Sequence, residues 1–439
     1  MKRVLIISYY WPPTGGSGVQ RWVKFAKYLP SEGWQPVIYT PENPEQLAVD
    51  TTLEAEIPQE AEIIKTRITE PYELYKKFLR RSGHSKEAVE VNPVNAQNKS
   101  FVQKAAMWVR GNFFRPDPRC LWIRPSVRFL EKYLKEHPVD LIVSTGPPQS
   151  MHLIGMKLAR KTGLPWIADF RDPWTRIFYF KHLCMTSATE RWHKKMEKKV
   201  LDEATAVVAV SPLVQQEFQS MTQTPVELIT NGFDECDFSA ERCVEAAGGE
   251  GTDFVITHTG LFAADGNPET LWDVLAEKCR KDIEFHRRLK IKLIGKTDEQ
   301  ITASIDKAGL KENLVDMGYQ PHSTAVEEQR KASLLILPLR KEPEYKAVLP
   351  GKLFEYLASW RPVLGIGQTD GAMSMILNNT KTGFVLDWED RASIKRFIDY
   401  CWEKHKKGEL TVDDADLSQF TRRNLTHRMA ELFEKSTKS

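Results

Sequence analysis

The sequence predicts an α/β protein built from parallel β-sheets that are covered by helices. Short apolar runs alternate with amphipathic stretches along most of the chain, which is the pattern of repeated βαβ units. The first apolar run, VLIISYY at residues 4–10, is continuous and bounded by turn residues, as expected for a strand buried on both faces. The alternation stops near residue 240 and then starts again, so two doubly wound domains are expected.

The first domain is expected to cover residues 1–238 and to begin with a βαβ unit. After the strand at 4–10, a glycine-rich turn, an amphipathic helix at 19–29 and a strand at 36–40 complete that unit. From about 45 to 135 the alternation weakens, and we predict an insertion of helices and loops there. Strands are expected again at 139–145, 165–170, 206–211 and 226–232, with helices near 150–162 and 188–203.

The second domain is expected to cover residues 253–415, after a linker. Residues 239–252, SAERCVEAAGGEGT, are small, polar and rich in glycine, as linkers are. The final segment, 416–439, is predicted to form a helix that crosses back to the first domain. Ligands of parallel sheets bind beyond the carboxyl ends of the strands, so two facing sheets predict a shared cleft. Strands of this domain are expected at 254–260, 289–295, 314–320, 334–339, 362–367 and 384–388.

The composition excludes several classes of protein. The 62 basic and 59 acidic residues give a net charge of +3, which argues against a dedicated nucleic-acid binder. None of the six cysteines stands in a CxxC pair, so the zinc knuckle and the thioredoxin-like motif are excluded, and no metal cluster is visible. Scattered cysteines are typical of reduced thiols in a cytosolic protein, and we expect a cytoplasmic protein.

The N-terminus has two interpretations. Met1 to Arg3 followed by the apolar run has the charge pattern of a short signal peptide. A Pro-Pro and glycine turn follows instead of a small-residue cleavage site, which favours a buried first strand. No apolar run approaches the ~18 residues that cross a bilayer, so we expect no membrane span.

A glycine-rich loop, TGGSG, follows the first strand. Gly15, Gly16 and Gly18, with Ser17 between them, permit close approach of the backbone, and the helix that follows offers free N–H groups to an anion or a sugar hydroxyl. The loop is not GxGxxG, and no acidic residue stands at the distance that would bind a ribose, so a dinucleotide fingerprint is a poor match. We predict an acceptor or phosphate loop, with a plain tight turn as the alternative.

The segment IADFRDPW brings three charges to the end of a strand. We predict a catalytic role for Asp169, Arg171 and Asp172, in which an aspartate accepts from an acceptor hydroxyl or acts as base and the arginine neutralises phosphate. The alternative is an Arg–Asp pair that closes the loop. His152, which follows STGPPQS, is predicted to face the cleft, and a structural histidine is the alternative.

The segment LPGKLFEY predicts an anion site at the start of a helix. Gly351 lies at the helix start, Lys352 in the first turn, and Glu355 one turn later. Free N–H groups, the helix dipole and a lysine suit a pyrophosphate, and the glutamate is placed to accept from two ribose hydroxyls. An idle surface pair is the alternative.

Residues 76–128 interleave basic and aromatic side chains. Such a mixture suits peripheral docking to an anionic membrane surface, and an insertion packed on its own aromatics is the alternative. The residues concerned are Lys76, Lys77, Arg80, Arg81, Arg110, Arg115 and Arg124 with Trp108, Phe113, Phe114 and Trp122.

With these motifs the chain resembles retaining glycosyltransferases of the GT-B fold, in the large family 4 (group 1) of nucleotide-sugar-dependent enzymes. The segments GYQPHSTAVEEQRKASLLILPL and GKLFEYLASWRPVLG are similar to the family's nucleobase segment and donor helix. The resemblance implies two Rossmann-like domains that face each other across a cleft. It also implies that Tyr319 and Gln320 lie near the base and that Glu355 binds the ribose.

Two positions depart from the family pattern. Ala347 stands where the family has a second glutamate, so Glu342 or Glu344 would contact the transferred sugar instead. The Arg and Lys that hold the diphosphate are missing from TGLFAADGNPE, where Gly260 would let the chain approach the phosphates. The cation that would substitute is Lys296, Arg340, Lys346 or Lys352.

The resemblance implies an enzyme that moves a sugar from a nucleotide-sugar donor to a glycan or lipid-linked acceptor, with retention and without a cofactor or metal. DFRDPW with STGPP resembles a subgroup that builds lipid-linked and surface polysaccharides, which agrees with peripheral contact at the inner membrane face. The alternatives are a nucleotide-sugar epimerase of the same architecture and an inactive sugar-nucleotide-binding subunit. A Rossmann oxidoreductase is a more distant alternative.

Overall fold

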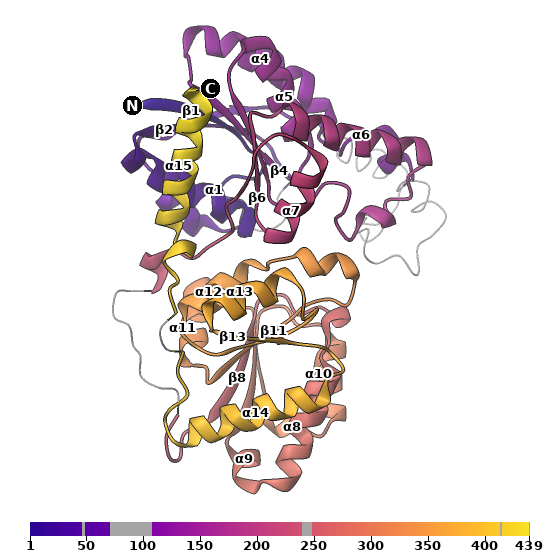
Figure 1. The fold of residues 1–439 in the computed structure, drawn as a ribbon, viewed down its shortest axis with the longest axis vertical. Coiled ribbons are helices and arrows are strands. Elements are labelled where there is room, and N and C mark those ends of the chain that lie inside the picture. The colour runs from indigo at the N-terminus through magenta and orange to yellow at the C-terminus, as the bar shows by residue number, and fades with distance from the viewer. Residues whose placement is uncertain (46–48, 71–107, 239–247, 413–414, 439) are drawn as a thin grey trace, which may run out of the picture. The chain divides into compact units, whose positions relative to one another are not determined.

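The computed structural model describes residues 1–45, 49–70, 108–238, 248–412 and 415–438. The chain divides into two compact units (Figure 1). Unit 1 comprises Met1–Thr230 together with Leu425–Ser439, and unit 2 comprises Asn231–Asn424. Among the described residues, no helix is both long and apolar enough to cross a membrane.

In the described part of unit 1, seven parallel strands form one sheet in the order β3-β2-β1-β4-β5-β6-β7. The order changes direction between β1 and β4, which defines a topological switch point of a doubly wound sheet. Ile6 of β1 lies opposite Ile38 on one side and Val143 on the other. The strands are β1 (Lys2–Ile7), β2 (Trp34–Pro41), β3 (Glu62–Thr66), β4 (Leu141–Gly146), β5 (Trp166–Phe170), β6 (Ala206–Ala209) and β7 (Val226–Leu228).

Apolar side chains at helical spacing explain how α1 (Ser17–Tyr28) packs on this sheet. Val19, Trp22, Val23 and Ala26 recur every three or four residues and are almost fully buried. They join Ile6 and its neighbours in one core cluster. The other long helices of the unit are α4 (Cys120–Glu136), α5 (Ser150–Thr162), α6 (Ser187–Glu203), α7 (Pro212–Met221) and α15 (Arg422–Lys438).

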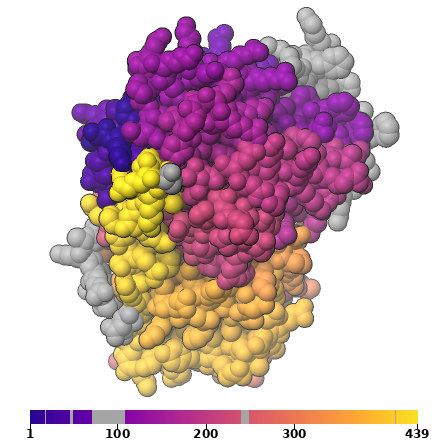
Figure 2. All heavy atoms as spheres, turned by 45° about the horizontal axis from the view of Figure 1, so that its top comes forward, coloured from indigo at the N-terminus to yellow at the C-terminus, as the bar shows by residue number. Residues whose placement is uncertain are grey.

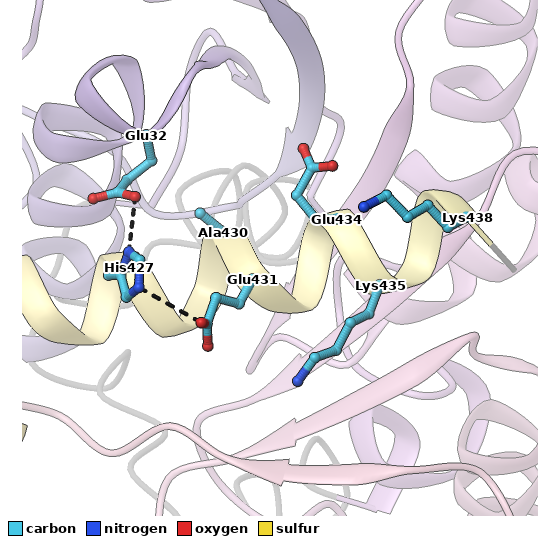
Figure 3. A pocket seen from close by; sticks show the side chains of 7 residues that line it. All are labelled: Glu32, His427, Ala430, Glu431, Glu434, Lys435 and Lys438. Carbon is cyan, nitrogen blue, oxygen red and sulfur yellow. Dashed lines mark hydrogen bonds and ion pairs between the residues drawn. The ribbon is translucent and has the colours of Figure 1, made fainter.

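The helix α15 brings the end of the chain beside its beginning. Leu425, Met429 and Phe433 lie in the core cluster of unit 1, and Lys2 Nζ lies 2.7 Å from a carboxylate oxygen of Glu434. In the space-filling view the yellow residues of α15 adjoin the indigo N-terminal residues (Figure 2). On the outer side of α15, His427 lies between Glu32 and Glu431, at 3.0 and 3.6 Å (Figure 3).

The stretch predicted to be an insertion contributes directly to the sheet. Glu62–Thr66 form β3, which pairs with β2, so the prediction of helices and loops alone is corrected here. Three of the five residues in EIIKT are polar, which concealed this strand at the edge of the sheet, where it is only half-buried. Trp122 of α4 stacks on Tyr39 with ring centroids 4.9 Å apart, and is core rather than surface. Residues 71–107, including Lys76, Lys77, Arg80 and Arg81, lie outside the described residues.

In the described part of unit 2, six parallel strands form a second sheet in the order β10-β9-β8-β11-β12-β13. Its switch point lies between β8 and β11. The strands are β8 (Phe254–Thr259), β9 (Leu289–Ile294), β10 (Leu314–Gly318), β11 (Leu334–Pro338), β12 (Val363–Ile366) and β13 (Gly383–Leu386). The helices are α8 (Glu269–Lys281), α9 (Ile283–Arg288), α10 (Glu299–Lys307), α11 (His322–Lys331), α12 (Gly351–Ala358), α13 (Ala372–Thr380) and α14 (Arg391–Lys406).

Candidate functional site

The start of α12 offers an anion site at the switch point of unit 2. Pro350 is the N-cap residue and makes no side-chain cap hydrogen bond, and the first turn holds no acidic residue. The positive end of the helix dipole is therefore not neutralised by the helix itself. Lys352 extends from this turn to the end of β8, where its Nζ donates to the carbonyl oxygen of Leu261 at 3.3 Å.

Lys352 also contacts a buried histidine. Its Nζ lies 3.2 Å from Nε2 of His258, a β8 residue with only 2% of its surface exposed. Burial, and then the charge of Lys352, hold the pKa of His258 well below its ordinary value, so the ring is neutral and accepts from the ammonium group. Burial lowers the pKa of Lys352 itself to about 8, against the opposing charge of Glu355.

Glycines leave space for this lysine. Gly260 follows β8 with a φ of +85°, and a Cβ there would lie 3.2 Å from Lys352 Nζ. A side chain would therefore strain the backbone and crowd the ammonium group. The exposed Lys296 follows the end of the neighbouring strand β9.

Glu355 lies one turn further along α12 and is held by two other groups. His322 Nε2 lies 3.2 Å from one carboxylate oxygen, and Gln329 Nε2 donates to the other at 3.2 Å. Burial raises the pKa of Glu355, but hydrogen bonds and charge from His322, Gln329 and Lys352 outweigh it, so the net pKa is lowered. The ionised carboxylate keeps 22% of its side-chain surface exposed and can accept from a ligand.

A buried network fixes α12 beneath these groups. Tyr356 Oη accepts from the backbone N–H of Thr259 at 2.8 Å, and Gln329 Nε2 donates to Thr259 Oγ1 at 3.0 Å. Tyr356 and Gln329 have no exposed surface. One residue each of β8, α11 and α12 is thereby tied to the others, which preorganises the site.

The remaining predicted donor residues lie apart from this network. Tyr319 is 85% exposed, and Gln320 donates to the carbonyl oxygen of Met317 at 2.7 Å. Arg340 pairs with Asp265 at 2.9 Å, and Lys346 pairs with Asp370. Of the predicted residues, the structure thus brings together Gly260, Gly351, Lys352 and Glu355.

The predicted catalytic Asp169 of unit 1 is a buried structural hub. Its side chain is 0% exposed, and it accepts from Arg21 at 2.9 Å and from Trp22 Nε1 and Thr145 Oγ1 at 2.8 Å each. Burial raises its pKa, but these donors, Arg21 first, outweigh burial and lower it. No part of this carboxylate is exposed to a substrate, which corrects its prediction as a catalytic group.

Arg171 and Asp172 lie half-buried after β5, beside the glycine loop. A Cβ on Gly18 would overlap the Arg171 guanidinium, so Gly18 is needed for this contact. Arg171 donates to the carbonyl oxygen of Pro147. Burial raises the pKa of Asp172 to about 6, against the charge of Arg171. Gly16 has a φ of +113° and caps α1, and Gly15 precedes it.

His152 is a core residue, so the structural alternative is favoured over the predicted cleft position. It is 0% exposed, lies 2.9 Å from Ser144 Oγ through Nδ1, and stacks on Phe170 at 4.3 Å. Burial lowers its pKa to about 3.

Three site residues escaped the sequence analysis, namely His258, His322 and Gln329. His258 directly precedes Thr259-Gly260 at the end of a predicted strand, and His322 and Gln329 lie in the segment that resembles the family's nucleobase segment, but none of the three was singled out. Among the described residues, no group of three or more His, Cys, Asp or Glu side chains could hold a metal ion.

Solved structures share this fold over the whole chain. A glycosyltransferase from Rickettsia africae ESF-5 superimposes with a TM-score of 0.63 at 15% identity, covering 100% of this chain and 99% of that one. The Anabaena protein HepE in complex with UDP-glucose gives 0.59 at 15% identity, with 99% and 100% covered. The lipopolysaccharide outer core galactosyltransferase WaaB gives 0.58 at 13% identity, with 99% and 100% covered. These likenesses establish the GT-B fold.

The sequence comparison shows the family to which the chain belongs. No curated protein sequence matches the chain at a significant level. Residues 16–235, which include most of the glycine loop and the whole DFRDPW segment, match the profile described as Glycosyltransferase Family 4. Because this match spans half of a chain that has the GT-B fold throughout, the protein belongs to glycosyltransferase family 4 and is a glycosyltransferase.

Proposed function

We propose that the protein transfers a sugar from a nucleotide-sugar donor to a glycan or lipid-linked acceptor, with retention, in the synthesis of a surface polysaccharide. One observation carries the donor half of this proposal. Lys352 lies in the open first turn of α12, and the ionised, partly exposed Glu355 follows one turn later.

The anionic diphosphate of the donor binds at the start of α12 in this proposal. The glycosidic bond to the phosphate breaks in the reaction, and negative charge grows on the departing oxygen. Backbone N–H groups and the Lys352 ammonium stabilise that charge, which is commonly the largest catalytic term. Glu355 accepts from two ribose hydroxyls, for which His322 and Gln329 hold it in place.

The acceptor belongs to unit 1 in this proposal. The acceptor oxygen forms the new bond on the same face of the sugar, and its proton passes to the departing phosphate. Asp172, with its pKa raised to about 6, binds the acceptor hydroxyl, and Arg171 lies against the glycine loop. In this proposal Asp172 and Arg171, and not the buried Asp169, act on the acceptor.

The donor class is supported by the neighbour that was solved with UDP-glucose, and the pathway by the neighbour named for the lipopolysaccharide outer core. Both share the fold with this chain at 15% and 13% identity. The exposed Trp108 and Phe113 support peripheral contact with the inner face of a membrane.

A panel of nucleotide sugars tests the donor site. The true donor raises the melting temperature by mass action, and Glu355→Ala abolishes that shift. Asp172→Asn keeps the shift but lowers the transfer of labelled sugar to an extracted acceptor. Unchanged stabilisation of the Glu355→Ala variant would remove the donor assignment. Release of an epimerised nucleotide sugar without an acceptor would favour the epimerase, and binding without turnover would favour the inactive subunit.

A further inference from the structure

Unit 1 contains a cavity of about 360 Å³ at its own topological switch point. Tyr10, after β1, and Pro147 and Pro148, after β4, form one side of it. The rest of the lining comes from residues 110–119, whose first part is helical, and from residues 174–193, which end in α6. The carboxyl edge at a switch point is where parallel sheets bind ligands, so this cavity is placed for a substrate.

The walls of the cavity are mainly apolar. They consist largely of aromatic and aliphatic side chains and proline rings, notably Phe114, Trp174, Tyr179, Phe180, Leu183 and Met185. Gly111 lets the first of these segments pack closely against the second, because a Cβ there would lie 2.4 Å from the carbonyl oxygen of Leu183. Asn112 joins the same two segments by donating to the carbonyl oxygen of Cys184 at 3.2 Å.

The charged residues Asp117 and Arg119 of the lining are already bound to protein. Asp117 accepts from the backbone N–H and the hydroxyl of Ser150, both at 2.8 Å. Arg119 donates to Glu45 at 2.7 Å. A hydrocarbon chain has no hydrogen bonds to water to lose when it enters this mainly apolar lining.

His193 provides one donor inside this apolar lining. It is 2% exposed, and burial, followed by the charge of Arg115, lowers its pKa to about 4. Trp174 Nε1 donates to Nδ1 at 3.0 Å, so the proton of the neutral ring is on Nε2. Among the described residues no acceptor binds this Nε2–H, which leaves it for one oxygen of a ligand.

The segment that forms one wall also carries apolar side chains at the surface. Trp108 is 45% exposed, Val109 43% and Phe113 66%, and they flank Arg110 and Gly111 of the lining. Exposed aromatic side chains next to an arginine suit the interface of an anionic bilayer. The apolar surface and the apolar cavity therefore share one short segment. A ligand that emerges from a membrane could pass from the bilayer into the cavity along this segment.

We infer that this cavity binds the first part of the hydrocarbon chain of a lipid-linked acceptor, whose linking phosphate accepts from His193 Nε2–H near Arg110. The volume lies at the low end of the ~300–1,000 Å³ range of ligand sites, so only the first part of a long chain fits. This inference rests on the proposed function and selects the lipid-linked class among its acceptors.

Binding of farnesyl monophosphate to the full-length protein, measured by calorimetry, tests the inference. Met185→Trp fills the cavity and is expected to weaken binding by about tenfold or more. Met185→Leu and Leu121→Trp, the latter at a 46% exposed position outside the lining, are expected to bind as the wild type does. His193→Phe keeps a ring of similar shape. It is expected to weaken the binding of farnesyl monophosphate but not the binding of farnesol.

Photolabelling keeps the test informative if Met185→Trp is unstable. A diazirine-bearing prenyl phosphate on the wild-type protein should label residues 108–119 and 174–193. Labelling elsewhere, equal binding by Met185→Trp, or displacement of the probe by a water-soluble oligosaccharide or by inorganic phosphate would overturn the inference. Stabilisation by a nucleotide sugar is measured in parallel, so failure of the donor site is seen separately from failure of this cavity.

Discussion

Two acidic residues that the sequence marks as functional have opposite environments. Asp169 of unit 1 is fully buried and is neutralised by Arg21, with Trp22 and Thr145 as further donors. Glu355 of unit 2 keeps 22% of its side chain exposed and is held by an exposed His322 and a neutral Gln329. A buried charge with a full set of donors stabilises the fold, whereas a charge with exposed surface can exchange its partners for a ligand.

Asp169 and Glu355 differ in what their hydrogen-bond donors do elsewhere in the fold. Arg21 also donates to the carbonyl oxygens of Ile229 and Thr230, at 2.9 and 2.7 Å, so the Asp169 pair ties α1 and β5 to the chain after β7. The donors of Glu355 come from a single helix, α11. Substitutions of the two groups should therefore separate stability from binding.

The largest expected effect follows Arg21→Met. This change leaves the Asp169 charge buried and unpaired, and the free energy of unfolding should fall by about 3–5 kcal/mol. Urea denaturation measures it. The control is Arg160→Met, which breaks an exposed pair with Glu203 and should cost about 1 kcal/mol or less. Similar losses in the two variants would contradict the structural role of the buried pair.

Glu355→Gln should change binding and leave stability nearly unchanged. The variant loses charge-assisted hydrogen bonds worth about 1.5–3 kcal/mol, so the affinity for the nucleotide sugar should fall by roughly 10- to 100-fold. Calorimetric titration measures the affinity, and exposed Glu312→Gln is the control. A variant that melts far below the wild type but binds the donor normally would reverse the comparison with Asp169.

The pH dependence of donor binding sharpens the same comparison. Lys352 is protonated below its pKa of about 8 and binds the diphosphate as a cation. Affinity should therefore be highest below that pH and fall as pH rises through it, by up to about tenfold per pH unit until the lysine of the complex titrates. Lys352→Arg keeps its charge and should remove this dependence. A flat wild-type profile between pH 7 and 9.5 would show that Lys352 does not bind the anion.

The smallest effect is expected at the surface of α15, where His427 lies between Glu32 and Glu431 (Figure 3). The hydrogen bond and charge of Glu32 raise the pKa of His427. The protonated His427 therefore stabilises the fold. This contribution is fully present at pH values below the ordinary histidine pKa of about 6.5 and is lost as the pH rises through the folded-state pKa. His427→Gln should flatten that slope while moving the melting temperature by roughly 2 °C or less. A slope that persists in the variant would point to another group.

The sequence predicted most of the strands because buried parallel strands are continuous apolar runs. VLII of β1 and LLILP of β11 are recognisable without any partner, whereas EIIKT at an edge is not. The donor helix was predicted for a similar local reason, since a Pro-Gly start, Lys352 and Glu355 lie within one and a half turns.

The sequence by itself determined the α/β class and the helix that begins near Pro350 with Lys352 in its first turn, because each depends on neighbours within a few residues. Only the tertiary structure decided that Asp169 meets Arg21, 148 residues away, and that Lys352 meets His258, 94 residues away. The order of the strands brings such pairs together, and burial then sets their protonation states. The spacing of residues along the sequence indicates neither the strand order nor the burial. The same physics separates a carboxylate that stabilises the fold from one that remains available to a ligand.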